Sequence, residues 1–246
     1  MTVAFISDLH LTPERPDIQQ RFEAFLSVEA DRLDTLYILG DLFEYWIGDD
    51  ASRHLGQEYV EQLLQRLCNQ GVAVRVMRGN RDFLLGDDFA RRTGCTLIPD
   101  PYRIRLGLRD VLLMHGDSLC TDDVEHQQFR TLVQSPDWQR AFLSESIGAR
   151  DEVARRLRYR SEQGKRYKPS DIMDVNEHTV REVFAAHSAP ILIHGHTHRP
   201  GVHTLTTGHR TVHRIVLGDW FEQQSVVRLS AAGLTLSPGG QTVPLD

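Results

Sequence analysis

The stretch TLYILGD, residues 35–41, contains the strand and the turn from which the fold can be worked out. Its first five residues form a continuous run of β-branched, aromatic and apolar side chains, which is typical of a strand buried in a parallel sheet. Gly40 ends the run, and Asp41 follows as a single carboxylate at the carboxyl end of the strand. Two further strand-like runs, at residues 3–7 and 72–77, are each followed by a polar cluster.

The segments between these three runs carry apolar residues at helical spacing. One segment covers residues 17–33, and the other ends at Gly71. Because apolar residues three and four positions apart lie on one face of a helix, both segments are predicted to be amphipathic helices. Residues 1–80 therefore read β-α-β-α-β, which predicts an α/β fold with a parallel sheet and right-handed crossover connections.

The remaining chain alternates between short strands and a helical stretch. A short helix is expected at residues 87–92, and strands are expected in two hairpins, around Gly107 and Gly233, and at residues 191–194 and 214–217. Residues 122–189 carry no strand signal, and Ser135 followed by Pro136 is a typical helix start. We therefore predict an α/β body of residues 1–121 and 190–246 with a helical cap inserted at residues 122–189.

Composition excludes several classes of protein. The chain has 246 residues, 40% of them apolar, and a net charge of −6, which predicts a globular protein without whole-surface binding to nucleic acid. Its three cysteines form no CxxC pair, which argues against a disulfide framework or a thiolate zinc site and favours a reducing compartment. The chain has no long apolar run, and it reaches Asp8 too early for a signal peptide, so a soluble, cytoplasmic protein is expected.

Five polar clusters follow strand-like runs and contain side chains that bind metal ions. They are Asp8-Leu-His10, Gly40-Asp41, GNRD at residues 79–82, HGD at residues 115–117 and HGHTH at residues 194–198. Residues just past the carboxyl ends of strands in an α/β sheet converge on one crevice. Carboxylate, imidazole and amide groups without thiolates suit ions such as Mn²⁺, Fe²⁺ or Zn²⁺. Two ions that share a carboxylate can activate water against a phosphoester, and Asp41 is the expected bridge because it stands alone after a buried strand.

Each cluster taken alone also has an ordinary structural explanation. Asp8 with His10, and Gly40 with Asp41, occur as loop and turn residues in many proteins, and Asn80 or His115 could satisfy local hydrogen bonds. His194 lies inside the apolar strand and is assigned a structural role. The occurrence of all five clusters in this order, each after a strand, favours the metal site.

The order of these motifs resembles that of the calcineurin-like metallophosphoesterases. The resemblance implies a β-sandwich flanked by helices, and the sequence departs from the superfamily at Arg81, where a histidine is usual. The stretches between the motifs are similar to those of the UDP-2,3-diacylglucosamine pyrophosphatases of Gram-negative lipid A synthesis. These stretches are YILGDLFE (37–44), WIGDD (46–50), GNRDFLLG (79–86), HGDSLCTDD (115–123) and IMDVN (172–176).

This resemblance implies hydrolysis of UDP-2,3-diacylglucosamine to 2,3-diacylglucosamine 1-phosphate (lipid X) and UMP, by attack of water on the α-phosphorus, with two Mn²⁺ ions per subunit. It places one ion on Asp8, His10, Asp41 and His198, and the other on Asp41, Asn80, His115 and His196, with the catalytic role on Asp41, Asn80, His115 and His196. It places the substrate on Asn80, Arg81, Asp123, Ser161, Lys165, Lys168 and His196. It also implies peripheral binding to the cytoplasmic face of the inner membrane, without an obligate protein partner.

The cap suits such a substrate, although each of its features has another explanation. Residues 150–168 contain eight Lys or Arg and three Asp or Glu, a basic run that could hold phosphates or could be a solvated face. An apolar wall for the acyl chains is expected from residues that could equally form core packing, namely Trp46, Phe129, Leu132, Trp138, Phe142, Ile147, Val153 and Leu157. The alternative functions are a phosphodiesterase or phosphatase of the same superfamily acting on a soluble nucleotide or phosphoprotein, and a metal-free scaffold.

Overall fold

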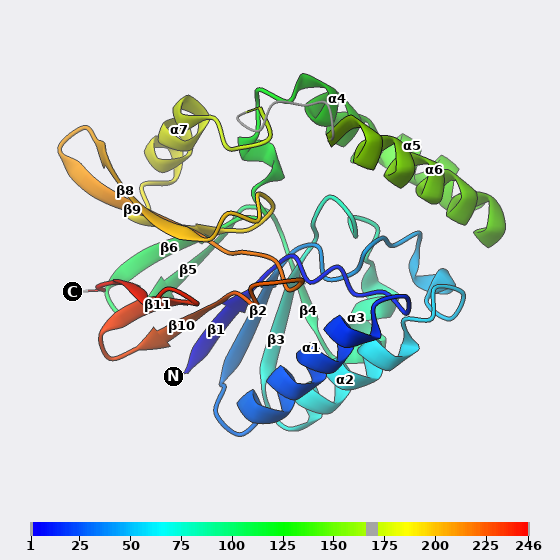
Figure 1. The fold of residues 1–246 in the computed structure, drawn as a ribbon, viewed down its shortest axis with the longest axis horizontal. Coiled ribbons are helices and arrows are strands. Elements are labelled where there is room, and N and C mark those ends of the chain that lie inside the picture. Colours follow the sequence, from blue (N-terminus) through cyan, green and yellow to red (C-terminus); the bar gives the residue numbers. More distant parts are fainter. Residues whose placement is uncertain (1, 166–171, 246) are drawn as a thin grey trace.

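The computed structural model describes residues 2–165 and 172–245, which form two β-sheets packed face to face with helices on their outer sides (Figure 1). Among these residues the first sheet has seven strands in the order β12-β11-β10-β1-β2-β3-β4. Their bounds are β1 Val3–Ile6, β2 Thr35–Leu39, β3 Ala73–Met77, β4 Thr96–Ile98, β10 Val226–Ser230, β11 Gly233–Ser237 and β12 Gln241–Val243. Strands β1 to β4 run parallel, so the predicted parallel sheet is confirmed.

The second sheet has the order β5-β6-β7-β9-β8 within the described residues. Strands β6, β7 and β9 run parallel, and β5 and β8 pair antiparallel at the two edges. The bounds are β5 Tyr102–Leu106, β6 Arg109–Leu113, β7 Ile191–His194, β8 Gly201–Thr207 and β9 Arg210–Val216. The hairpins expected around Gly107 and Gly233 are both present.

Within the described part of the chain, three apolar cores hold these layers together. Side chains of a strand alternate between the two faces of its sheet, so in β1 Phe5 points toward the second sheet and Ile6 toward the helices. Helices α1 (Pro16–Glu29), α2 (Glu58–Asn69) and α3 (Asp87–Thr93) cover the outer face of the first sheet. Helix α7 (Glu177–His187) covers the second sheet through Val180 and Phe184.

The other three helices lie together at one end of the two sheets. They are α4 (Val124–Val133), α5 (Pro136–Ser144) and α6 (Ile147–Lys165), and short 3₁₀ turns at Asp49–Ala51 and Asp117–Leu119 lie beneath them. The helix start predicted at Ser135 is confirmed, because its hydroxyl accepts the backbone N–H of Trp138 at 3.2 Å. The buried Arg150 of α6 donates to the Ile47 carbonyl oxygen at 2.6 Å, and Arg130 of α4 donates to Asp117 at 2.8 Å.

The structure differs from the sequence-based expectations in a few elements. Helix α1 ends at Glu29 rather than at residue 33, because the chain turns there: the N–H groups of Arg32 and Leu33 both donate to the Glu29 carbonyl oxygen. Strands β4, β8 and β12 were not expected. Strands β4 and β12 have only three residues each, and β8 is an edge strand with few buried side chains.

Candidate metal centre and the cavity beside it

All seven predicted metal ligands come together where the strands of both sheets end. Asp8 and His10 follow β1, Asp41 follows β2 and Asn80 follows β3 in the first sheet. His115 follows β6 in the second sheet, and His196 and His198 follow β7. The two sheets therefore meet at one site through the carboxyl ends of their parallel strands, as an α/β arrangement predicts.

The first half of this site is formed by Asp8, His10 and His198. Their ligand atoms all lie within 4.8 Å of one another. The Nε2 atoms of His10 and His198 are 3.3 Å apart, and His198 Nε2 lies 3.4 Å from Asp8 Oδ1. Two imidazole nitrogens and a carboxylate thus lie around one small volume, and together they could hold a divalent cation.

The second half is formed by Asn80, His115 and His196. The Oδ1 atom of Asn80 lies 3.0 Å from His115 Nε2 and 2.9 Å from His196 Nδ1. Asp41 stands between the halves, because its Oδ2 is 3.8 Å from His10 Nε2 and its Oδ1 is 3.7 Å from His115 Nε2. One carboxylate therefore presents an oxygen to each half.

The donor set fits a pair of divalent ions. Asp8 is fully buried; its Oδ2 accepts the backbone N–H of His196 at 2.9 Å, whereas its Oδ1 makes no hydrogen bond with the described residues and faces Nε2 of His198. The ligand atoms are carboxylate, imidazole and amide groups, a mixture that suits borderline to hard cations.

The backbone around these ligands is held in an uncommon conformation. Asp8, His10, Asp41, His196 and His198 all have positive φ angles, between 50° and 67°. Left-handed backbone at residues with a side chain is strained and is often found at functional sites. Glycines allow the close approach of the loops, because a Cβ on Gly79 would lie 2.2 Å from Asp41 Oδ1, and a Cβ on Gly195 would lie 2.2 Å from Asp8 Oδ2.

A second set of groups contacts the Nδ1 atoms of three of these histidine rings. His10 Nδ1 lies 3.3 Å from a carboxylate oxygen of Glu44, and His198 Nδ1 lies 3.5 Å from one of Asp219. His115 Nδ1 lies 2.9 Å from the Leu39 carbonyl oxygen. Such partners orient metal-binding imidazoles. No role was predicted for Glu44 or Asp219 from the sequence, although Glu44 lies in one of the family-like stretches.

Asp82 has a structural role next to these ligands. Its carboxylate is fully buried and accepts the backbone N–H groups of Leu42 at 2.8 Å and Gly79 at 2.7 Å. It therefore ties the loop after β2 to the loop after β3, which carry Asp41 and Asn80. Burial, together with the charge of Asp41, raises the pKa of Asp82 to about 6.

The carboxylates change the protonation of the histidines in the metal-free protein. Burial alone would lower the pKa of His115, but the carboxylates of Asp41, Asp117 and Asp8 outweigh burial and raise it to about 9. At His198 burial is outweighed by Asp8 and Asp219, and the pKa rises to about 10. Burial and the nearby His115 lower the pKa of His196. His115 and His198 therefore carry protons at neutral pH when no metal competes for them.

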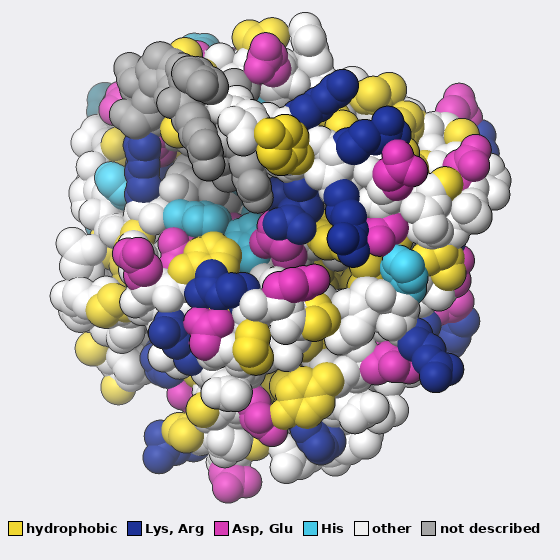
Figure 2. Space-filling model, turned by 45° about the vertical axis from the view of Figure 1, so that its right-hand side comes forward, with side chains coloured by type: hydrophobic (Ala, Val, Ile, Leu, Met, Phe, Trp, Pro, Cys, Tyr) yellow, Lys and Arg dark blue, Asp and Glu magenta, His cyan; other side chains and the backbone are white. Residues whose placement is uncertain are grey.

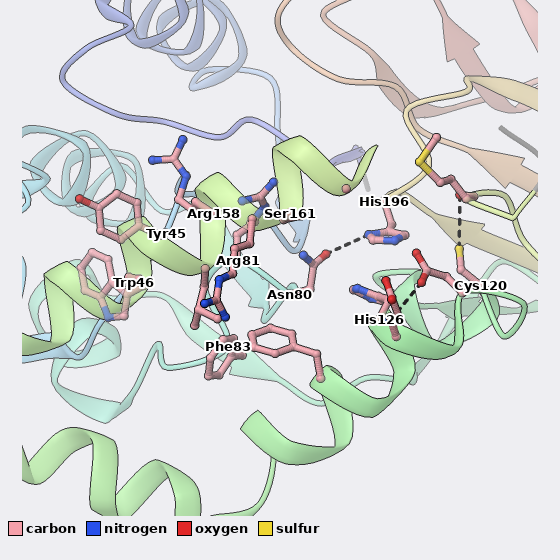
Figure 3. A pocket seen from close by; sticks show the side chains of 18 of the residues that line it. Tyr45, Trp46, Asn80, Arg81, Phe83, Cys120, His126, Arg158, Ser161 and His196 are labelled. Carbon is pink, nitrogen blue, oxygen red and sulfur yellow. Dashed lines mark hydrogen bonds between the residues drawn. The ribbon is translucent and has the colours of Figure 1, made fainter. Parts of the chain in front are cut away.

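A cavity of about 490 Å³ opens between the metal-site loops and helices α4 to α6 (Figure 3). Asn80, His196 and His198 lie on its wall, so the donor set opens directly into it. The polar wall also contains predicted substrate contacts, namely Arg81, Asp123 and Ser161. Lys168 lies outside the described residues, and so does the side chain of Lys165. Figure 2 shows histidine, acidic and basic side chains gathered near the centre of this face.

Much of the remaining wall of the cavity is apolar. Five of the residues expected for the acyl wall line it, namely Trp46, Phe129, Trp138, Phe142 and Leu157. Phe142 stacks on Trp138 at 4.8 Å between ring centroids, and Phe83 contacts Trp138 at 6.0 Å. The expectation was wrong for Leu132, Ile147 and Val153, which are not among the residues that line the cavity. Leu132 is 54% exposed, and Ile147 packs against the apolar core between the first sheet and its helices.

Comparison with known proteins agrees with this arrangement. Residues 1–200 match the family model described as calcineurin-like phosphoesterase. The chain therefore belongs to the calcineurin-like phosphoesterases, which confirms the expected fold class and implies a dimetal centre.

Curated relatives cover nearly the whole chain and share one name. UDP-2,3-diacylglucosamine hydrolase of Stenotrophomonas maltophilia strain K279a is 49% identical over 96% of this chain and 98% of its own length. Proteins of the same name from Aromatoleum aromaticum and Chromohalobacter salexigens are each 47% identical, over 95% and 89% of this chain and the same shares of their own lengths. The resemblance to these hydrolases that the motifs indicated is confirmed. No helix in the described residues is long and apolar enough to cross a membrane.

Proposed function

We propose that this protein hydrolyses UDP-2,3-diacylglucosamine to 2,3-diacylglucosamine 1-phosphate and UMP. The observation that carries the proposal is the cavity, where a set of metal-binding side chains and an arginine face an apolar wall. A nucleotide-linked lipid needs both kinds of surface, because its diphosphate is charged and its acyl chains are apolar. The shared name of relatives that are 45–49% identical to this chain supports the same substrate.

Two Mn²⁺ ions fit the donor set as we propose it. Asp8, His10, Asp41 and His198 would hold one ion, and Asp41, Asn80, His115 and His196 the other. Ions at these positions supply Lewis-acid activation of water and neutralise charge on the phosphoryl oxygens. The two oxygens of Asp41 face opposite halves of the site, which supports its role as the bridge.

The chain's own side chains orient the diphosphate. Arg81 lines the cavity beside Asn80, and its planar guanidinium can bind two phosphoryl oxygens at once. We propose that Asp123, Ser161, Lys165, Lys168 and His196 provide the remaining polar contacts. Attack of water on the α-phosphorus then breaks its bond to the bridging oxygen, so the new hydroxyl group stays with UMP and the acylated sugar leaves with its phosphate.

We propose that helices α4, α5 and α6, within the predicted cap of residues 122–189, shelter the acyl chains, whereas α7 of the same stretch packs on the second sheet. Helices α4, α5 and α6 supply the apolar side chains Phe129, Trp138, Phe142 and Leu157 to the cavity. A fatty acyl chain in this part of the cavity is removed from water, and each buried CH₂ group contributes about 0.8 kcal/mol.

The cap is also the proposed contact with the cytoplasmic face of the inner membrane. Exposed apolar side chains come from three of its helices, namely Val124 and Leu132 from α4, Leu143 from α5 and Tyr159 from α6. The same segment carries the basic run of residues 150–168, which would be attracted to anionic lipid headgroups. This contact would bring the cavity to the surface where a diacylated substrate resides.

The decisive experiment is incubation of the purified protein with Mn²⁺ and UDP-2,3-diacylglucosamine, followed by identification of the products by mass spectrometry. We expect UMP and 2,3-diacylglucosamine 1-phosphate in equal amounts. Hydrolysis of a soluble phosphodiester without hydrolysis of the lipid nucleotide would instead indicate a different substrate within the superfamily. Failure to take up metal after dialysis against Mn²⁺ would indicate a scaffold.

A further inference from the structure

Glu44 is held rigidly between the metal site and the cap. It lies three residues after Asp41, and its backbone N–H donates to the Leu11 carbonyl oxygen at 3.1 Å. Leu11 and Phe43 also form a parallel bridge, so the loops that follow β1 and β2 are joined at this point. The backbone of Glu44 is therefore held against the loop that follows β1.

The carboxylate of Glu44 meets cationic or imidazole groups from three different segments. His10 Nδ1, from the loop after β1, lies at 3.3 Å. Arg81 Nη1, from the loop after β3, lies at 3.8 Å, and Arg158 Nη2, from cap helix α6, lies at 2.6 Å. The side chain of Glu44 is only 13% exposed, so solvent screens these interactions weakly.

Glu44 acts on the cavity through these neighbours. Arg81 and Arg158 both line the cavity, whereas Glu44 is not among the described residues that line it. Arg158 also lies over the Tyr45 ring, with its guanidinium carbon 5.3 Å from the ring centroid, and Tyr45 is another lining residue. Figure 3 shows Arg81 and Arg158 on the same side of the cavity, next to Ser161.

We propose that Glu44 is a positioning residue that orients the metal-binding ring of His10 and holds Arg81 and Arg158 in place at the cavity wall. The Glu44 carboxylate, 3.3 Å from Nδ1 of His10, favours a proton on Nδ1 and so leaves Nε2 as the acceptor that faces Asp41 and His198. The two arginines, which are long and flexible, are kept in one arrangement before the substrate arrives. The part of this inference that concerns the arginines rests on the proposed function.

Two measurable quantities should change when Glu44 is removed. Loss of a group that orients a metal ligand typically lowers metal affinity by about 10- to 100-fold. Release of two arginines means that the substrate must order them on binding, which we expect to raise KM by about tenfold. A carboxylate that merely competed with the diphosphate for the arginines would have the opposite effect, because its removal would lower KM.

The experiment compares Glu44→Ala, Glu44→Gln and the unaltered protein. Mn²⁺ affinity is measured by titration calorimetry on metal-depleted protein, without substrate, and kcat and KM are measured at saturating Mn²⁺. We expect weaker Mn²⁺ binding and a higher KM for Glu44→Ala. Glu44→Gln should recover most of the Mn²⁺ affinity, because its amide oxygen can still accept from His10, and should keep a raised KM because the charge that holds the arginines is gone.

Glu14→Ala is the matched control. Glu14 is an exposed carboxylate near the cap arginine Arg158, and its nearest partner is Thr12 rather than a metal-site residue. Unchanged Mn²⁺ affinity in Glu44→Ala would overturn the orienting role, and an unchanged or lower KM would overturn the role toward the arginines. If the unaltered protein does not hydrolyse the lipid nucleotide, the proposed function fails, while the calorimetric comparison still decides the role toward His10.

Discussion

Replacing Asp41 with asparagine should disable the metal centre while leaving the fold intact. Asp41 Oδ1 accepts the backbone N–H of Arg81 at 2.8 Å, and an asparagine side chain has an amide oxygen of the same size in the same place. The loop after β3 therefore keeps its hydrogen bond. What is lost is the negative charge between His10 and His115, and with it one of the two oxygens that face the halves of the site.

The expected loss of catalytic rate follows from the role of the Asp41 carboxylate as a bridge between the two ions. A bound metal contributes several kcal/mol of charge stabilisation in the transition state, and the proposed bridge serves both ions. If about 4 kcal/mol is lost, the rate should fall by about 10³-fold. We also expect Asp41→Asn to bind at most one Mn²⁺ tightly, because neither half keeps its full set of charged ligands.

The assay combines Mn²⁺ stoichiometry, kcat and thermal unfolding of the same preparation. Asp110→Asn serves as the control, since Asp110 is a partly exposed carboxylate on the β5–β6 hairpin that pairs with Arg103. The control should retain both activity and metal. Binding of two Mn²⁺ ions by Asp41→Asn, with activity within tenfold of the unaltered protein, would refute the bridging assignment.

Three other predictions concern the substrate and the protons of the site. Arg81→Ala should raise KM by tenfold or more, because a bidentate phosphate contact is lost, while Mn²⁺ stoichiometry by elemental analysis stays the same; loss of metal would show that Arg81 is misassigned. Hydrolysis in ¹⁸O-water should place the label in UMP by mass spectrometry, and label in the sugar phosphate would exclude attack on the α-phosphorus. The pKa values of His115 and His198 are raised to about 9 and about 10, so both rings are protonated at pH 7.5. Metal uptake should therefore release about two protons. For the same reason, metal affinity should increase between pH 7 and 9. Calorimetry in buffers of different ionisation enthalpy measures this release, and uptake without protons would contradict it.

Metal uptake is expected to strengthen as the pH rises, whereas the stability of the metal-free protein should fall. His115 and His198 bind protons more tightly in the folded state than in the unfolded state. The stability that they contribute is therefore fully present below the unfolded pKa of about 6.5 and is lost as the pH rises through 9 to 10. Urea unfolding of metal-depleted protein should give a lower midpoint at pH 9 than at pH 7, and a rising midpoint would refute these protonation states.

The central part of the fold was predictable because its signals are local. Strand β2 is a buried run that stops at Gly40, and α2 repeats its apolar residues at helical spacing, so neither depends on distant contacts for recognition. Strand β8 could not be predicted in this way, because an edge strand buries few side chains and its position is set by pairing with β9. The same limit applies to the cap, where Leu132 and Phe129 lie on one helix and only packing decides which of them faces the cavity.

The candidate site shows the same division. Its seven proposed ligands follow strands directly, so the rule that strand ends converge was enough to place them together. Glu44 and Asp219 are different, because the role of each depends on contact with a histidine that is distant in the chain. Glu44 contacts His10, and Asp219 contacts His198. A carboxylate in a loop has no local pattern that distinguishes such a partner from a solvated charge.

The left-handed backbone at Asp8, His10, Asp41, His196 and His198 has a consequence for how this chain can evolve. Glycine adopts that conformation without strain, whereas other residues do so at a cost of about 1 kcal/mol or more. Mutation toward glycine at these five positions would therefore relieve backbone strain while it removes a ligand. In a lineage that no longer needed the reaction, these residues would be among the first to drift, and glycines at the ends of the central strands would record the loss of catalysis.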